Sequence, residues 1–317
     1  METRREFLVL ALAAGAAAGL SPKLRSLGRG FESVDDLEVH IFSKHLQFLD
    51  FAAMAEAAAD IGFDGVDLTV RPDGHVEPER VDDDLPSAIE MIRRHGLKAT
   101  MITTSVTDAD DPASQRVLQT AAGLGISYYR MGWYRHPEEI PIQESLEAFR
   151  TKARGLALLN RELQIRGCYQ NHAGNYVGAS IWELWALIHD LDPAWLGCQY
   201  DIRHATVEGG LSWPQGLRLI RPFVNSIIAK DVMWTQDGGA WKIANVPIGE
   251  GMVDWVRYFR LLADHGIRAP LSLHMEYPIG GAENGRRGAD VDGAAVFSAM
   301  RRDLEAVRSY WREALAK

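Results

Sequence analysis

From residue 37 to the C-terminus, the chain alternates short apolar segments typical of strands with longer segments whose apolar residues recur at helical spacing. We predict strands at 37–43, 65–70, 97–106, 126–133, 165–171, 196–201, 225–230 and 270–277. Helices are expected between and after them, at 50–61, 85–95, 113–124, 142–163, 180–191, 213–220, 253–265 and 293–315. Regular alternation through mostly short connections predicts an α/β chain with a single closed (β/α)8 barrel, rather than an open doubly wound sheet.

The N-terminal residues are set apart from this alternation. In residues 1–20, Arg4 and Arg5 precede a mildly apolar stretch of small residues, a pattern that resembles a twin-arginine signal segment. Residues 21–36 are typical of a linker, and residues 37–317 form the expected catalytic domain. The pattern predicts export by the twin-arginine machinery to a periplasmic or other extracytoplasmic location. An uncleaved anchor is the alternative, and no lipid anchor is expected because no cysteine follows the apolar run.

The charge balance limits the classes of partner. The chain of 317 residues carries a formal net charge of −9, and its basic residues form no run. Such a chain repels nucleic acid and anionic lipid unless its basic groups gather in one patch. We therefore expect a small-molecule partner and no nucleic acid. Monomer and oligomer are both compatible with the sequence.

Polar residues stand at the ends of the predicted strands. They occur in the segments Tyr169-Gln-Asn-His172, Asp201-Ile-Arg-His204, Lys230-Asp231 and His274-Met-Glu276. In a barrel of parallel strands the C-terminal strand ends face one mouth, so these side chains are expected around one cavity. Strand alternation predicts that Gln170 and His172 face the cavity and that Asn171 faces the helices.

Several of these segments, in this order, resemble the xylose-isomerase-like barrels of sugar isomerases and epimerases. The resemblance covers about residues 37–315 and rests on the motifs 62–67 (Gly-Phe-Asp-Gly-Val-Asp), Asn171-His172, Asp201 with His204, Lys230-Asp231, and 247–254 (Pro-Ile-Gly-Glu-Gly-Met-Val-Asp). It implies the same barrel fold and an activity on carbohydrates.

The resemblance also implies a divalent cation held by side chains from the fifth to the eighth strand. The corresponding positions are Gln170, Asp201, Ile228 and His274, of which only the aspartate follows the family pattern. Asp201, His274 and Gln170 are the candidate metal ligands, and their nitrogen and oxygen atoms suit manganese, zinc or a similar ion. The alternative is a hydrogen-bonded polar pocket without metal.

Three residues are candidates for catalysis and three for substrate binding. Glu276 and His204 are expected to move protons, and Lys230 to act as acid or base or to neutralise an enolate oxygen. An ion pair with a neighbouring carboxylate is the alternative role for Lys230. The candidates for substrate binding are His172, Arg130 and Asp67, which could instead serve barrel packing or a salt bridge at the mouth.

The expected function is an exported sugar isomerase or epimerase that acts on an unphosphorylated sugar or keto-sugar by removing a proton beside a carbonyl. Isomerisation, epimerisation and β-elimination share this step. A lyase or hydratase of keto-glycosides with the same fold is one alternative, and a non-catalytic sugar-binding barrel is another.

Overall fold

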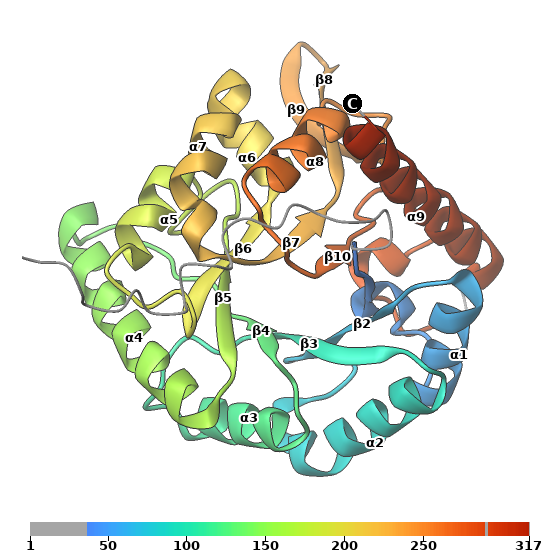
Figure 1. The fold of residues 1–317 in the computed structure, drawn as a ribbon, viewed down its shortest axis with the longest axis horizontal. Coiled ribbons are helices and arrows are strands. Elements are labelled where there is room, and N and C mark those ends of the chain that lie inside the picture. The colour runs from blue at the N-terminus through green and yellow to red at the C-terminus, as the bar shows by residue number, and fades with distance from the viewer. Residues whose placement is uncertain (1–36, 289–290, 317) are drawn as a thin grey trace, which may run out of the picture.

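The computed structural model describes residues 37–288 and 291–316, and they form a closed parallel barrel surrounded by helices (Figure 1). The barrel strands follow one another around the ring in the order β1-β10-β7-β6-β5-β4-β3-β2. They are β1 (Val39–Phe42), β2 (Gly65–Val70), β3 (Lys98–Thr104), β4 (Tyr128–Arg130), β5 (Arg166–Gln170), β6 (Leu196–Asp201), β7 (Val224–Ala229) and β10 (Leu271–Leu273). The predicted (β/α)8 barrel is confirmed.

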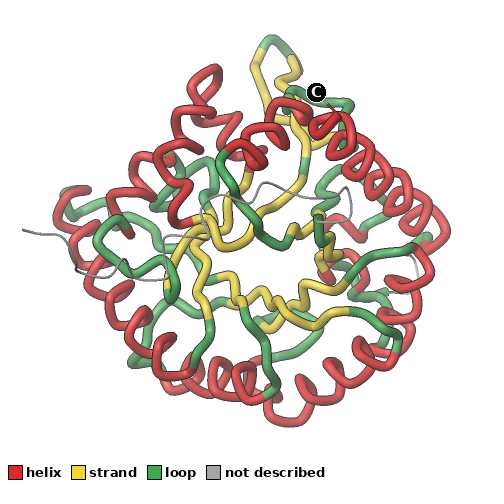
Figure 2. Tube along the Cα trace, viewed as in Figure 1, coloured by secondary structure: helices red, strands yellow, loops and turns green. Residues whose placement is uncertain are grey.

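Helices form an outer ring around the strands (Figure 2). In the described chain they are α1 (Phe51–Ile61), α2 (Val81–Arg94), α3 (Pro112–Gly123), α4 (Ile142–Leu163), α5 (Ile181–Ile188), α6 (Ile202–Gly209), α7 (Trp213–Ile220), α8 (Trp255–Asp264) and α9 (Gly293–Ala316). None of these helices is long and apolar enough to cross a membrane. The predicted signal segment and linker, residues 1–36, lie outside the described residues.

Local sequence signals explain where the helices begin and end. Asp50 caps α1 by accepting a hydrogen bond from the backbone N–H of Ala53, and Ser180 caps α5 in the same way through Glu183. Helix α1 ends at Gly62, whose φ of 100° lies in the left-handed region that glycine adopts without strain. These ends fix the approach of each helix to the barrel.

The last barrel strand is shorter than predicted. The backbone N–H of His274 still donates to the carbonyl of Ala229, but the next N–H, that of Met275, donates to the imidazole of His45. The ladder therefore stops after one further bond, so that His274 and Glu276 lie beyond β10 rather than inside a strand reaching residue 277. This change keeps both residues at the C-terminal mouth.

Two elements were not predicted. Helix α6 directly follows β6, and the side chain of Asp201 caps it by accepting from the N–H of His204. The antiparallel hairpin of β8 (Asp231–Asp237) and β9 (Ala240–Val246) follows β7 and projects from the ring beside α8 (Figure 1). Gly238 and Gly239, with φ of 57° and 82°, make its tight turn.

Candidate active site

Eight of the nine residues predicted for the site lie at the C-terminal ends of barrel strands or just beyond them. The ninth, Asp67, lies deeper, inside β2. The strands themselves contain Asp67 (β2), Arg130 (β4), Gln170 (β5) and Asp201 (β6), whereas His172, His204, Lys230, His274 and Glu276 follow strands. All are buried except His172 and Glu276, which are partly exposed. Hydrogen bonds, ion pairs and ring contacts connect them, as described below, while their chemical roles stay predictions.

Lys230 is the centre of one ion cluster. Its Nζ lies 3.1 Å from Oδ2 of Asp201 and 3.3 Å from Oε2 of Glu276. The side chains of Lys230 and Asp201 are 3% and 0% exposed, while that of Glu276 is 25% exposed. Attraction between charges is strong at such low exposure. Of the two carboxylates on this ammonium group, only Glu276 is open to a bound molecule.

His204 packs against this cluster from α6. Its Nδ1 accepts the backbone N–H of Ala173 at 3.1 Å and lies 2.9 Å from Nη1 of Arg203. Nε2 lies 2.9 Å from Nζ of Lys230 and 3.6 Å from Oδ2 of Asp201. Burial, followed by the charge of Lys230, lowers the pKa of His204 well below its usual range. His204 is therefore a neutral ring in contact with the lysine at neutral pH.

Gln170 joins Arg130 to Asp201. Its Oε1 accepts from Nη1 of Arg130 at 3.1 Å, and its Nε2 donates to Oδ2 of Asp201 at 2.7 Å. Because a guanidinium group only donates, the carbonyl of Gln170 must face Arg130 and its nitrogen must face the aspartate. The orientation of this amide is thus fixed by its neighbours on β4 and β6.

Asn171 does not face the helices, contrary to the prediction. Its Nδ2 donates to the carbonyl of Asp201, and its Oδ1 accepts the N–H of the same residue at 2.8 Å. The strand ladder ends here, so the side chain replaces the missing backbone pairing. Asn171 therefore fixes the position of Asp201.

His274 lies within a second chain of hydrogen bonds. Its Nε2 is 3.1 Å from Oγ of Ser272, which donates to Oδ2 of Asp67 at 2.7 Å, and its ring stacks on Phe42 at 4.1 Å. Burial lowers the pKa of His274 to about 3 and raises the pKa of Asp67. Ser272 was missed from the sequence, although it stands two residues before His274 and so on the same strand face.

The residues predicted as metal ligands are not arranged to hold a metal ion. Oδ2 of Asp201 already faces the ammonium group of Lys230 and the amide nitrogen of Gln170, and Oδ1 accepts the N–H of His204. Gln170 presents a nitrogen rather than a carbonyl. Within residues 37–288 and 291–316, no group of three or more His, Cys, Asp or Glu side chains could hold a metal ion. The donors fit an internal ammonium group instead.

His172 packs against His204 at the mouth. The two ring centroids are 3.9 Å apart, and Trp133 lies 4.9 Å from His172 on the other side. The guanidinium group of Arg130 lies over the ring of Trp133, at 4.2 Å. Burial lowers the pKa of His172 to about 4. Trp133 therefore lies between His172, which follows β5, and Arg130, at the end of β4.

Sequence patterns give little or no indication of several further basic residues at the mouth. Lys44 places its Nζ 3.6 Å from Oε1 of Glu276, and Arg71 lies over the ring of Phe42. Arg203 donates to Oδ1 of Asn245, on the hairpin strand β9, at 2.8 and 3.1 Å. The signal that could have identified Arg71 is its place as a basic residue directly after a strand. Asn245 had no such signal, because the hairpin that carries it was not predicted.

Asp231 has a structural role in spite of its place beside Lys230. Its carboxylate accepts the backbone N–H groups of Gly249, Gly251 and Val253, and the indole N–H of Trp255. A Cβ atom at Gly251 would lie 2.2 Å from Oδ1 of Asp231, so only glycine fits there. This anchoring explains the motif at 247–254.

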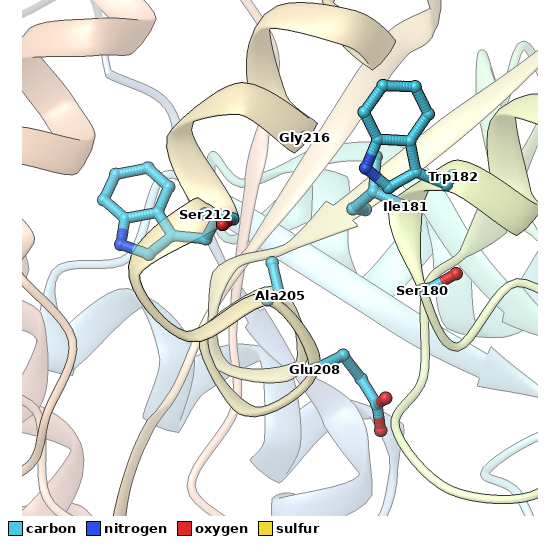
Figure 3. A pocket seen from close by; sticks show the side chains of 9 residues that line it. Ser180, Ile181, Trp182, Ala205, Glu208, Ser212 and Gly216 are labelled. Atoms are coloured by element: carbon cyan, nitrogen blue, oxygen red, sulfur yellow. The ribbon is translucent and has the colours of Figure 1, made fainter.

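A separate cavity of about 230 Å³ lies among α5, α6 and α7. Trp182, Glu208 and Ser180 are among its lining residues (Figure 3). None of the nine predicted residues lines it. It is therefore a feature of the outer helices and not part of the barrel mouth.

Comparisons with known proteins agree on the fold. The family model described as xylose isomerase-like TIM barrel matches residues 55–295. A D-psicose 3-epimerase from Clostridium cellulolyticum, solved with D-tagatose, is 14% identical with a TM-score of 0.65; the match covers 87% of this chain and 99% of the epimerase.

Two further solved structures are similar to the same extent. A xylose isomerase-like protein from Mycobacterium smegmatis, solved with magnesium, is 16% identical with a TM-score of 0.62, and the match covers 89% of this chain and 100% of that chain. A probable 3-DHS dehydratase from Bacillus anthracis is 14% identical with a TM-score of 0.60, over 83% and 97% of the two chains. Comparison with curated protein sequences gives no significant match.

Proposed function

Because this chain belongs to the xylose isomerase-like TIM barrel family, we propose that it is a sugar isomerase or epimerase-like enzyme that removes a proton beside the carbonyl of a sugar or keto-sugar. The observation that carries the proposal is the setting of Glu276. Its carboxylate is partly exposed at the mouth and lies 3.3 Å from the amino group of Lys230 and 3.6 Å from that of Lys44. D-Psicose 3-epimerases solved with D-tagatose and with D-fructose have similar folds, which supports a carbohydrate substrate.

Glu276 is the base of this proposal. Burial alone would raise its pKa, but the charges of Lys230 and Lys44, with His274, hold the pKa of Glu276 well below its usual range. The carboxylate is therefore ionised at neutral pH. Asp201, which touches the same ammonium group, is fully buried and cannot reach a substrate proton.

The two lysines stabilise the enolate. As Glu276 accepts the proton it loses its negative charge, while the carbonyl oxygen of the substrate gains one. The ammonium groups lie beside the carboxylate and the carbonyl oxygen, so they have an anionic partner before and after the proton moves. Fixed charges placed in this way stabilise a transition state. No step requires a metal ion, and Lys230 supplies the cation. In the proposal His204 contacts the amino group of Lys230 at 2.9 Å and positions it.

Exchange of carbon-bound hydrogen with heavy water tests this function. A keto-sugar that is turned over should take up deuterium beside its carbonyl, as followed by proton NMR. Glu276→Gln should slow this exchange by about 100-fold or more, the usual contribution of a positioned base. Glu147→Gln, at a 59% exposed position on α4, is the matched control and should leave the rate unchanged. Turnover without deuterium uptake, at a normal rate in Glu276→Gln, would refute the enolate step.

Export by the twin-arginine route is a second part of the proposal, supported by Arg4, Arg5 and the stretch of small residues after them. Replacing both arginines by lysine should retain the protein in the cytoplasm. The measurement is the distribution of the chain between cytoplasmic and extracytoplasmic fractions. An unchanged exported yield would rule the signal out.

A further inference from the structure

Two arginines at the mouth lack a carboxylate partner in the part of the chain that the structure describes. Arg71 follows β2, and its guanidinium group lies 5.6 Å from the ring centroid of Phe42. Arg130 ends β4 and is 5% exposed. Within the described residues, no carboxylate lies within 4.0 Å of either guanidinium group, and Nε of Arg130 has no hydrogen-bond partner. Buried charges in proteins are normally paired, so this pair of cations requires an explanation.

Both side chains belong to the inner face of the barrel. Asp67 points inward, because it accepts from Thr103 on β3 and from Ser272 on β10. Arg71 stands four residues later and, by strand alternation, on the same side. Tyr129 donates to Asn160 of α4 and so faces the helices, which places the next residue, Arg130, inside.

The pKa values of both arginines are lowered, as expected for cations inside the barrel. Burial, followed by the charge of Arg71, lowers the pKa of Arg130 to about 9. Burial lowers the pKa of Arg71 as well, although Asp67, Glu276 and the exposed Asp73 act against it. Burial is the larger cause for both arginines, and the carboxylates of Asp67 and Glu276 offset only part of it.

The buried and half-buried charges of the mouth are positive in sum. The mouth has four such carboxylates, those of Asp67, Asp201, Asp231 and Glu276, and five such basic side chains, those of Lys44, Arg71, Arg130, Arg203 and Lys230. The chain as a whole carries −9. A positive mouth in an acidic protein concentrates anions there.

We infer that the substrate carries an anionic oxyacid group, a carboxylate or a phosphate, which binds between Arg71 and Arg130. The planar forks of guanidinium groups match such groups with paired hydrogen bonds, and the buried Nε–H of Arg130 has no partner in the described structure. The inference rests on the proposed function, since the anionic group would hold the sugar with its carbonyl against Glu276. It narrows the substrate class to sugar acids or sugar phosphates.

Binding of three probes tests the inference. Titration calorimetry would compare 2-keto-D-gluconate, D-fructose 6-phosphate and neutral D-fructose, all in a Glu276→Gln background so that no turnover intervenes. We expect one of the anions to bind at least about 10-fold more tightly than D-fructose, the effect of one or two charge-assisted hydrogen bonds. Preference for the keto-acid would assign a carboxylate, and preference for the phosphate ester would assign a phosphate.

Arginine variants provide the control. Arg71→Met should weaken binding of the preferred anion by about 10-fold or more and leave D-fructose unaffected. Arg94→Met, which removes a 65% exposed arginine paired with Glu90 on α2, should change neither. Arg130→Met should have the same effect as Arg71→Met. If loss of the contact with Gln170 prevents Arg130→Met from folding, Arg71→Met still decides the question. Arg71 is half-buried and makes no side-chain hydrogen bond in the described structure.

Equal affinity for all three probes, or equal behaviour of Arg71→Met and Arg94→Met, would overturn the inference. Failure of the anion site can be distinguished from failure of the proposed function. Deuterium exchange into a neutral keto-sugar with no effect of Arg71→Met would retain the function and remove the anion site. Arginine-dependent anion binding without any exchange would do the reverse.

Discussion

The two halves of the barrel mouth neutralise their charges in different ways. On the side of β5, β6, β7 and β10, Lys230 lies between the carboxylates of Asp201 and Glu276, and Arg203 bonds to Asn245 and to Nδ1 of His204. On the side of β2 and β4, Arg71 and Arg130 lack such partners in the described structure. In the first half the charged groups have partners without a ligand, which suits proton transfer. The second half becomes neutral only when an anion binds.

The largest expected effect comes from removing the centre of the first half. Lys230→Met leaves the buried carboxylate of Asp201 without its cation, so the free energy of unfolding should fall by about 3–5 kcal/mol. Exchange catalysis should drop by about 100-fold or more, because the enolate loses a cation. Urea unfolding and proton NMR measure the two effects. Lys242→Met on the exposed hairpin is the control, and if both variants were equally stable the Lys230 cluster would not be a stabilising ion pair.

Acid should lower the stability of the protein through the histidines on the side of β5, β6, β7 and β10. Folding holds the pKa of His172 at about 4 and that of His274 at about 3, against 6.5 for an ordinary histidine. Below pH 6.5 the unfolded chain binds more protons at these positions, so the free energy of unfolding falls, by up to about 2 kcal/mol for each histidine at pH 5. The raised pKa values of Asp67 and Asp201 act in the opposite direction.

His172→Asn isolates this contribution. The variant should lose less stability than the wild type between pH 7 and pH 5, as measured by urea unfolding at both values. A wild type and variant with the same pH dependence would show that His172 is not held neutral by folding.

On the side of β2 and β4, loss of a positive charge should not lower the stability of the free protein. Arg71→Met removes an unpaired cation that repels Arg130, so the free protein should be unchanged or more stable, by up to about 1 kcal/mol. The stabilisation that a bound sugar acid or sugar phosphate gives to the wild type should disappear. Thermal unfolding with and without the anion measures both. A clear loss of stability in the free variant would mean that Arg71 has a structural partner.

Chelation is expected to have the smallest effect. Since the donors around Asp201 are occupied by Lys230 and Gln170, treatment with a chelator should leave exchange activity and thermal stability unchanged. Metal analysis of the purified protein accompanies the assay. A stoichiometric divalent ion whose removal abolishes activity would contradict the assignment of the cation to Lys230.

The barrel could be predicted from the sequence where the periodicity was strong. Helix α4 and strand β6 begin and end at the predicted residues, because an uninterrupted amphipathic pattern and a fully buried apolar run leave few alternatives. The β8–β9 hairpin was missed because only Asp231 and Val232 of its strand residues are buried and the others show no clear alternation. Its Gly238-Gly239 turn was the remaining signal.

The site was predictable as a set of positions but not as a set of contacts. Parallel strands bring their C-terminal ends together, which is sufficient to place Asp201, Lys230 and Glu276 at one mouth. The direction of the Gln170 amide depends on Arg130, a residue 40 positions earlier on another strand. Period-2 alternation gives the face of a side chain but not its partner, so an ammonium group among the predicted metal ligands could only be found in three dimensions.

The central claim is that one half of the mouth transfers the proton and the other holds the anion. The direct test is the steady-state kinetics of Glu276→Gln and Arg71→Met with the anionic keto-sugar that the binding experiment selects. The account predicts that Glu276→Gln lowers kcat by about 100-fold or more with little change in KM, whereas Arg71→Met raises KM by about 10-fold or more and largely preserves kcat. If both variants lowered kcat alone, or both raised KM alone, the division of the mouth into two halves would be contradicted.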